Sequence, residues 1–193
     1  MKIRILAAVL VASAGASAAT VDLWGYPLSS WKITREKGVW VDDWDGNGKS
    51  GYHLGQDVSA TAGTSVKNSR WGIVRFAGPK SGYGYVVIIE SPRDAVAPTS
   101  DPATWKNVRV QVYGHLRNDT AMAATKAKIG KAISKGATIG TIGSKSENGG
   151  FNPHLHYGVK LGRYTDTWTY WGYSSSATVN AEWLKGNLVI DAY

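Results

Sequence analysis

The chain of 193 residues contains no cysteine. This absence excludes disulfide bonds and a lipid anchor attached to cysteine, so stability must come from the core and from any bound metal. Export remains compatible with the sequence, because an exporting pathway permits disulfides without requiring them. The chain also lacks an apolar run of about 20 residues, the length that a membrane-spanning helix needs. We therefore expect no membrane span.

The first 18 residues have the organisation of a secretory signal. Lys2 and Arg4 form a basic start, residues 5–11 are apolar, and residues 16–18 (Ala-Ser-Ala) form a small-residue cleavage site. A buried N-terminal helix is the alternative, but these three features rarely follow one another by accident. We predict cleavage near Ala18 and a secreted or periplasmic protein, with the cell envelope deciding between the two.

Basic residues outnumber acidic ones, and the formal net charge is +8. Two of the positive charges, Lys2 and Arg4, would leave with the signal. A basic exported protein is attracted to anionic polymers such as those of a cell wall or a lipid surface. Nucleic acid is the rival partner, but the chain has no block of Lys and Arg and no nucleic-acid motif, so we expect none. The processed length fits one domain, which we expect to be monomeric.

Short β-strands dominate the pattern after the N-terminal region. They are predicted where β-branched and aromatic residues alternate or cluster between turns. The segments concerned are residues 71–77, 85–90, 108–113, 137–142 and 154–159. One or two helical turns are predicted within residues 121–133, and a short helix is predicted at 180–186. Residues 91–106, with three prolines, form a long excursion. The prediction is an all-β fold of mainly antiparallel sheets, a sandwich or partial barrel, with a few short helices.

Residues 19–50 are rich in aromatic and turn-forming residues. We predict an irregular N-terminal arm packed on a catalytic domain of residues 51–193, with a short strand at 32–35. Whether this arm blocks the site before activation stays open.

Within the arm, residues 43–48 (Asp-Trp-Asp-Gly-Asn-Gly) resemble the start of a calcium-binding loop. An EF-hand loop needs a bidentate glutamate at its twelfth position, which here is Leu54 when counted from Asp43. A turn built from Gly, Asp and Asn is therefore the preferred interpretation, and calcium is the alternative.

The chain has only four histidines, and each lies in a segment suited to a functional site. His154 and His156 are two residues apart in a predicted strand, so their side chains point to one face, about 6–7 Å apart along the chain. His53 precedes Asp57 by four residues, and His115 lies at the end of another predicted strand. These five side chains are the candidates for a catalytic centre.

Two imidazoles and a carboxylate from this set suit a hydrolytic zinc site. Such a site takes three protein ligands, at about 2.0–2.2 Å, and leaves a fourth position for water. Two His and one Asp leave a net charge of about +1, which keeps the ion Lewis-acidic. The remaining imidazoles would act as general base and acid and stabilise the oxyanion. Spacing alone does not say whether His154 or His156 binds the metal.

The motifs resemble those of the lysostaphin-like (LytM-type) zinc metalloendopeptidases, which cleave the peptide part of bacterial peptidoglycan. The chain has His-x-x-x-Asp first, Tyr-Gly-His in the middle and His-Leu-His last. The segments between them also resemble strands and a turn of that family. These segments are Trp-Gly-Ile-Val-Arg-Phe-Ala-Gly at 71–78, Gly-Tyr-Gly-Tyr-Val-Val-Ile-Ile at 82–89 and Ile-Ser-Lys-Gly-Ala-Thr-Ile-Gly at 133–140. Three motifs in order make the resemblance specific between residues 53 and 159.

The resemblance implies one zinc ion, Zn2+, held by His53, Asp57 and His156. It makes His115 and His154 the catalytic pair, which orient or deprotonate water and stabilise developing charge. The implied activity is that of a secreted zinc metalloendopeptidase hydrolysing peptide cross-links of peptidoglycan through a zinc-activated water. The bond itself stays open between a D-alanine cross-link to a diamino acid, an oligoglycine bridge and another peptide.

Two other functions are compatible with the same motifs. A non-catalytic module that binds the wall or activates other hydrolases would be expected to lack one or more of the five site residues, and all five are present. A zinc peptidase acting on proteins would have identical motifs. The proline-rich excursion, the turn at 43–48 and the aromatic tail at 161–193 depart from the family pattern, and we expect them to shape the groove walls.

Overall fold

The computed structural model describes residues 24–94 and 101–192. The predicted signal, the first residues of the predicted arm and part of the 91–106 excursion lie outside this range. The strands are β1 (Ile33–Arg35), β2 (Trp40–Val41), β3 (Gly51–His53), β4 (Gln56–Ser59), β5 (Ser65–Lys67), β6 (Gly72–Lys80), β7 (Gly84–Pro92), β8 (Val108–Leu116), β9 (Ala132–Ile133), β10 (Thr138–Thr141), β11 (His154–Leu161), β12 (Tyr173–Ser174) and β13 (Trp183–Leu184). The helices are a 3-10 helix (Pro102–Thr104), α1 (Thr120–Lys126), α2 (Ala177–Ala181) and α3 (Gly186–Asp191).

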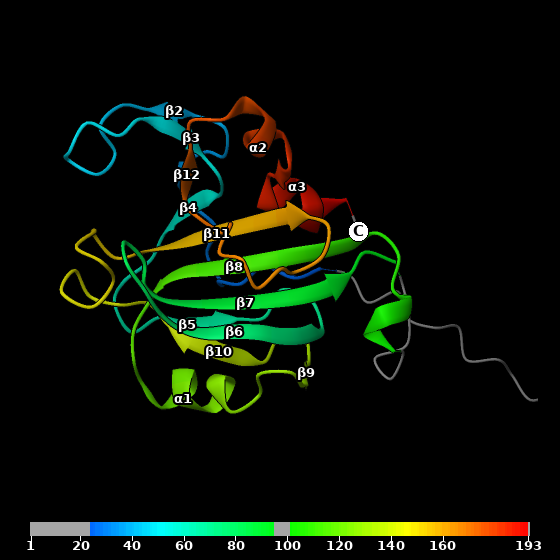
Figure 1. The fold of residues 1–193 in the computed structure, drawn as a ribbon. Coiled ribbons are helices and arrows are strands. Elements are labelled where there is room, and N and C mark those ends of the chain that lie inside the picture. Colours follow the sequence, from blue (N-terminus) through cyan, green and yellow to red (C-terminus); the bar gives the residue numbers. More distant parts are fainter. Residues whose placement is uncertain (1–23, 95–100, 193) are drawn as a thin grey trace, which may run out of the picture.

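The strands form one large sheet and two small ones. The large sheet has eight strands in the order β1-β4-β11-β8-β7-β6-β9, with β13 also paired to β11. β10 and β5 form a two-stranded sheet, and β12, β3 and β2 form a three-stranded sheet. In Figure 1 the long strands β11, β8, β7 and β6 lie side by side, with the β2-β3-β12 sheet above them and α1 below. Every described strand pair is antiparallel, which confirms the predicted fold class.

The large sheet is covered on both faces, and this explains the uninterrupted apolar run in β7. Val87 and Ile89 pack in one core cluster, whereas Val86 and Ile88 pack in another on the opposite face. All four side chains have no exposed surface. Each buried aliphatic side chain of this size stabilises the fold by about 1.5–3 kcal/mol relative to its exposed state.

Segments far apart in sequence supply the two covers. One face receives Met122 of α1 and Ile139 of β10, together with Trp24 and Leu28 from the start of the described chain. The tail covers the other face, where Tyr170 is nearly fully buried. The sheet is thereby covered on both faces.

The predicted helix at residues 180–186 is wrong. α2 ends at Ala181, Trp183 and Leu184 form strand β13 against β11, and α3 begins only at Gly186. The buried indole of Trp183 and the pairing with β11 outweigh local helix propensity here. The helical turn or two expected within 121–133 is confirmed as α1, which ends at Lys126 and is followed by β9.

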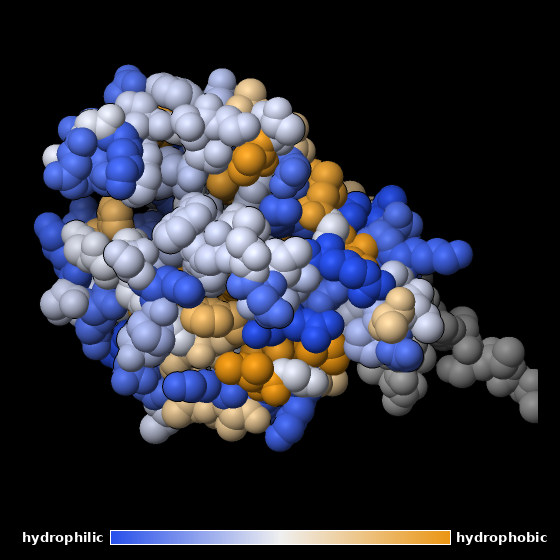
Figure 2. Space-filling model, in the orientation of Figure 1, coloured by the Kyte–Doolittle hydropathy of each residue, from blue (hydrophilic) through white to orange (hydrophobic). Residues whose placement is uncertain are grey.

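The face of the molecule that Figure 2 shows is mainly polar. In Figure 2 hydrophilic residues cover most of the visible face, and hydrophobic ones appear as separate patches. Among the described residues, no helix has the length and apolar character needed to cross a membrane.

Candidate metal and catalytic site

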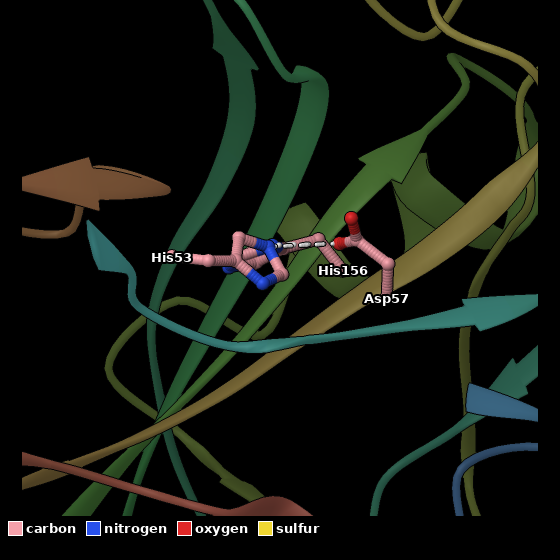
Figure 3. Close-up of side chains that lie close together, drawn as sticks. All are labelled: His53, Asp57 and His156. Atoms are coloured by element: carbon pink, nitrogen blue, oxygen red, sulfur yellow. Dashed lines mark hydrogen bonds and ion pairs between the residues drawn. The ribbon is translucent and has the colours of Figure 1, made fainter. Parts of the chain in front are cut away.

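Three neighbouring strands place the predicted metal ligands together. His53 is the last residue of β3, Asp57 lies in β4, and His156 lies in β11 directly opposite Asp57. Alternation along β11 sends Leu155 and Tyr157 into one core and turns the histidines to the other face. Figure 3 shows the three side chains converging on one point.

The ligand atoms form a nearly equilateral triangle. The Nε2 atom of His53 lies 3.0 Å from Nδ1 of His156, and each of these nitrogens lies 3.1 Å from Oδ1 of Asp57. Ligands about 2.0–2.1 Å from a tetrahedral ion are about 3.3 Å apart, so the observed separations fit a zinc ion within a few tenths of an ångström. All three residues are buried, and they are the one group of potential metal ligands of this kind among the described residues.

Hydrogen bonding supports a lone pair on His53 that faces the triangle. Its Nδ1 atom lies 3.1 Å from the carbonyl oxygen of Glu36. A carbonyl only accepts, so the proton of the neutral ring lies on Nδ1 and leaves Nε2 free to bind a metal. The Nε2 atom of His156 is buried without a hydrogen-bond partner in the described part of the chain. Nε2 of His53, Nδ1 of His156 and Oδ1 of Asp57 all converge on the triangle. A metal ion there would accept a lone pair from each of them.

The carboxylate of Asp57 stays ionised at any physiological pH. Burial alone would raise its pKa, but the surrounding imidazoles of His154, His156 and His53 outweigh burial and hold the pKa far below its usual range. Burial acts in the opposite sense on His156 and lowers its pKa to about 4, despite the attraction of Asp57. A neutral imidazole and a carboxylate are the protonation states that a divalent ion requires.

His115 reaches the same cavity through an unusual backbone conformation. It lies near the end of β8 with a φ of 64°, in the left-handed region that non-glycine residues rarely adopt. The pairing of β7 with β8 shifts register beside it, between Tyr85 and Val87. Such an irregularity redirects a side chain, and the His115 ring comes to lie 4.3 Å from that of His154. Strain of this kind is concentrated at functional sites.

The environments of His115 and His154 move their pKa values in opposite directions. Burial, reinforced by the neighbouring imidazoles, lowers the pKa of His115 to about 3. Burial would also lower the pKa of His154, but the Asp57 carboxylate, whose Oδ1 lies 3.5 Å from its Nε2, outweighs that effect and raises it. The Nδ1 atom of His115 donates to the carbonyl of Asn148 at 2.8 Å, which leaves its Nε2 as a free base. Two imidazoles with pKa values shifted in opposite directions are thus set side by side.

The five residues lie in a groove of about 490 Å³. Trp44, Trp171 and Tyr173 contribute aromatic surface to its lining, and the Trp44 and Tyr173 rings are stacked with centroids 4.8 Å apart. The turn at 43–48 and the tail therefore do shape the groove.

The carboxylates of the 43–48 turn are engaged within the turn itself. Asp43 accepts a hydrogen bond from the amide of Gly48, and Asp45 accepts from the amides of Asn47 and Lys49. This geometry supports the turn interpretation over a calcium loop.

Two residues that line the groove were not predicted from the sequence to lie there. Arg35, at the end of β1, and Tyr83, in the turn before β7, both line the groove. Arg35 reaches Asp57 across the β1–β4 ladder. No motif marks Arg35, which only strand pairing brings to the site. Tyr83 lies in the family-like segment 82–89, but nothing in that segment points to a place beside the histidines.

Known proteins share parts of this chain. The proteins named "DD-carboxypeptidase/endopeptidase Mpg" of Neisseria meningitidis serogroup B and of Neisseria gonorrhoeae are 29% identical to this chain over 109 residues, which is 56% of this chain and 20% of theirs. The chain thus matches about a fifth of the length of these relatives.

Among solved structures, the antimicrobial peptidase lysostaphin from Staphylococcus simulans is similar with a TM-score of 0.55 and 19% identity, over 91% of this chain and 56% of that one. LytU is similar with a TM-score of 0.53 and 21% identity, over 88% of this chain and 90% of that one. At these identities the two structures establish the fold, which is lysostaphin-like. The model of peptidase family M23 matches residues 51–167, and the chain therefore belongs to this family.

Proposed function

We propose that this chain is a secreted zinc metalloendopeptidase that hydrolyses peptide cross-links of bacterial peptidoglycan. One observation carries the proposal: four strands bring two imidazoles and a carboxylate to mutual distances of 3.0–3.1 Å beside a second pair of imidazoles. Three metal ligands beside a general base and a general acid are sufficient groups for metal-assisted amide hydrolysis.

His53, Asp57 and His156 would hold the ion, which supplies Lewis acidity for the amide carbonyl and lowers the pKa of water. His115 has a free Nε2 and a lowered pKa, so it is suited to orient water and accept its proton. His154, with a raised pKa, is suited to donate a proton and to stabilise the negative charge that develops on the carbonyl oxygen.

Family membership and charge support the substrate. Relatives of this chain are named "DD-carboxypeptidase/endopeptidase Mpg", and for this chain we take a D-alanyl amide of the wall peptide as the candidate substrate class. The net charge of +8, which becomes +6 once Lys2 and Arg4 leave with the signal, favours attraction to anionic wall polymers. Export after cleavage near Ala18 belongs to the same proposal and is tested by N-terminal sequencing of the exported protein. The proposal also includes an arm of residues 19–50 on a catalytic domain of residues 51–193.

A non-catalytic wall-binding or activating module is the second candidate. The convergence of all five residues favours the enzyme, because a binding module has no need of a base beside a metal triad. A zinc peptidase against proteins would use the same geometry and is separated by substrate assays.

Digestion of purified peptidoglycan tests the proposal. We expect zinc-loaded protein to release peptides with new carboxyl and amino ends, chelator to abolish release and added zinc to restore it. Asp45→Asn, which changes a groove carboxylate outside the triad, serves as the control and should keep activity. Intact peptide cross-links after digestion with fully zinc-loaded protein would contradict the proposal.

A further inference from the structure

We propose that Arg35 binds a free α-carboxylate on the residue that supplies the nitrogen of the scissile amide. The proposal rests on the proposed function and narrows its substrate class. Arg35 lies opposite Asp57 in the β1–β4 ladder. Its side chain is 41% exposed and lines the groove, so a guanidinium group faces the substrate space directly beside the metal triad.

The Arg35 guanidinium is held in place and still has hydrogen-bond donors available. One terminal nitrogen, Nη1, donates a hydrogen bond to the hydroxyl of Tyr173 and lies 3.6 Å from Oδ2 of Asp57. A separation of 3.6 Å is too long for a hydrogen bond. The structure gives the other guanidinium nitrogens no partner among the described residues. Within the described chain, Arg35 therefore has unpaired N–H groups in the fixed planar geometry of a guanidinium. Guanidinium groups bind carboxylates through two parallel hydrogen bonds.

The charge of the groove favours an anion. Arg35 and Lys49 are its basic lining residues, and Asp45 and Asp57 are its acidic ones. Lys49 and Asp45 pair with each other at 3.3 Å, and Asp57 faces the ligand triangle through Oδ1. The four charges cancel, so a divalent ion would leave the groove positive. A substrate carboxylate next to Arg35 would reduce that excess.

Connectivity specifies which carboxylate fits. The Asp57 carboxylate faces the ligand triangle through Oδ1 and Arg35 through Oδ2, so the guanidinium lies one carboxylate group away from the metal position. In the substrate, an α-carboxylate on the nitrogen-side residue is separated from the scissile nitrogen by a single carbon atom. An amide to a C-terminal residue has such a carboxylate, and so does a cross-link to the amino group of a diamino acid whose adjacent carboxyl is free. An oligoglycine bridge has none, and the proposal excludes it as a preferred substrate.

A purely positional role is the competing explanation. Arg35 could orient Asp57 and Tyr173 without touching substrate. A positional role predicts that replacing Arg35 lowers activity equally on all substrates and changes zinc binding. Carboxylate binding predicts that activity falls only on substrates that carry the carboxylate.

Two synthetic peptides decide between these explanations. They differ only in a free carboxylate or a carboxamide at the nitrogen-side residue. We expect the zinc-loaded wild type to favour the carboxylate peptide by at least about 10-fold in kcat/KM, as a charged hydrogen-bonded pair implies. Arg35→Gln should lose that preference through a higher KM, Arg35→Lys should keep part of it, and both should retain wild-type zinc content. Lys49→Gln, which removes a groove cation already paired with Asp45, is the matched control and should keep the preference.

Binding provides a readout that does not depend on turnover. Calorimetric titration uses analogues of both peptides in which a methylene-amino group replaces the scissile amide. Tighter binding of the carboxylate analogue to wild type, lost in Arg35→Gln, supports the proposal even if the peptides are not hydrolysed, in which case the proposed function alone fails. Equal binding of the two analogues by the wild type overturns the Arg35 proposal whether or not the variants fold. Equal loss on both peptides in Arg35→Gln, with lowered zinc content, overturns it in favour of the positional role and leaves the proposed function intact.

Discussion

Asp57 lies directly opposite His156 in the ladder between β4 and β11, with Oδ1 of the first 3.1 Å from Nδ1 of the second. A shift of register by one residue would turn the side chains of β11 to the opposite face. The cores that bury Leu155 and Tyr157 on the other side of β11 oppose such a shift. The same packing that stabilises the sheet therefore fixes the metal triangle.

Replacing Asp57 by alanine should remove metal and activity together. The carboxylate is a predicted ligand, and without it two neutral imidazoles remain, so we expect less than about 0.1 zinc per chain. Elemental analysis of chelator-free protein measures this, alongside peptidoglycan hydrolysis. Asp45→Ala removes another groove carboxylate and should retain wild-type zinc; full zinc content in Asp57→Ala would refute the ligand assignment.

Replacing His115 by asparagine should separate metal binding from turnover. Asparagine is preferred over alanine because it tolerates the positive φ of this position. We expect near-normal zinc content and a fall of about 10²- to 10⁴-fold in kcat, the usual contribution of a general base. Rates equal to those of the wild type would reassign His115 to a structural role.

Gly55→Ala should disturb the site without altering any ligand. A Cβ atom at residue 55 would lie 2.6 Å from Nε2 of His156 and 2.8 Å from the carbonyl oxygen of Tyr157, so the imidazole must move. We expect zinc affinity to fall by about 10- to 100-fold, as for other changes that displace a ligand. Competition with a fluorescent chelator measures the affinity.

Gly25→Ala is the matched control for Gly55→Ala. A Cβ atom there would meet its nearest neighbours at an ordinary 3.8 Å. We expect Gly25→Ala to bind zinc as tightly as the wild type. If Gly55→Ala does so too, the close approach of residue 55 to His156 is not needed for zinc binding.

The metal-free protein should lose stability as the pH falls from neutrality. Burial lowers the pKa of His115 to about 3 and that of His156 to about 4, against about 6.5 in the unfolded chain. Between these values the unfolded state binds more protons, so stability present above about pH 6.5 is lost as the pH falls towards the folded-state values. The raised pKa of His154 acts in the opposite sense.

Urea unfolding with chelator present, between about pH 7.5 and about pH 4.5, measures this dependence. We expect the midpoint to fall with pH, and to fall less steeply in His115→Asn. A midpoint that stays constant in the wild type would contradict the account of two neutral, buried imidazoles.

The sequence pattern predicted the parts of the fold that depend on local alternation. The strands around 71–77, 85–90 and 108–113 are confirmed as β6, β7 and β8, each extended by a few residues. The facing of His154 and His156 to one side follows from the period of a strand. The helix predicted at 180–186 failed because Trp183 and Leu184 pair with a strand more than twenty residues earlier, a contact that no local pattern shows.

The five candidate side chains and two segments of the groove wall were identified from sequence, but the individual contacts that build the groove were not. Arg35 meets Asp57 only through the β1–β4 pairing, and Trp44 meets Tyr173 across more than a hundred residues of chain. The positive φ of His115 also leaves no mark in composition. Non-local contacts decide these features, and they are also the ones that bear on substrate choice.

Anomalous diffraction at the zinc edge, from crystals of chelator-free protein loaded with zinc, tests the central claim most directly. The account predicts a single strong peak within about 2.0–2.2 Å of Nε2 of His53, Oδ1 of Asp57 and Nδ1 of His156. A peak bound by other side chains, or no peak at this triangle at full zinc loading, would contradict it.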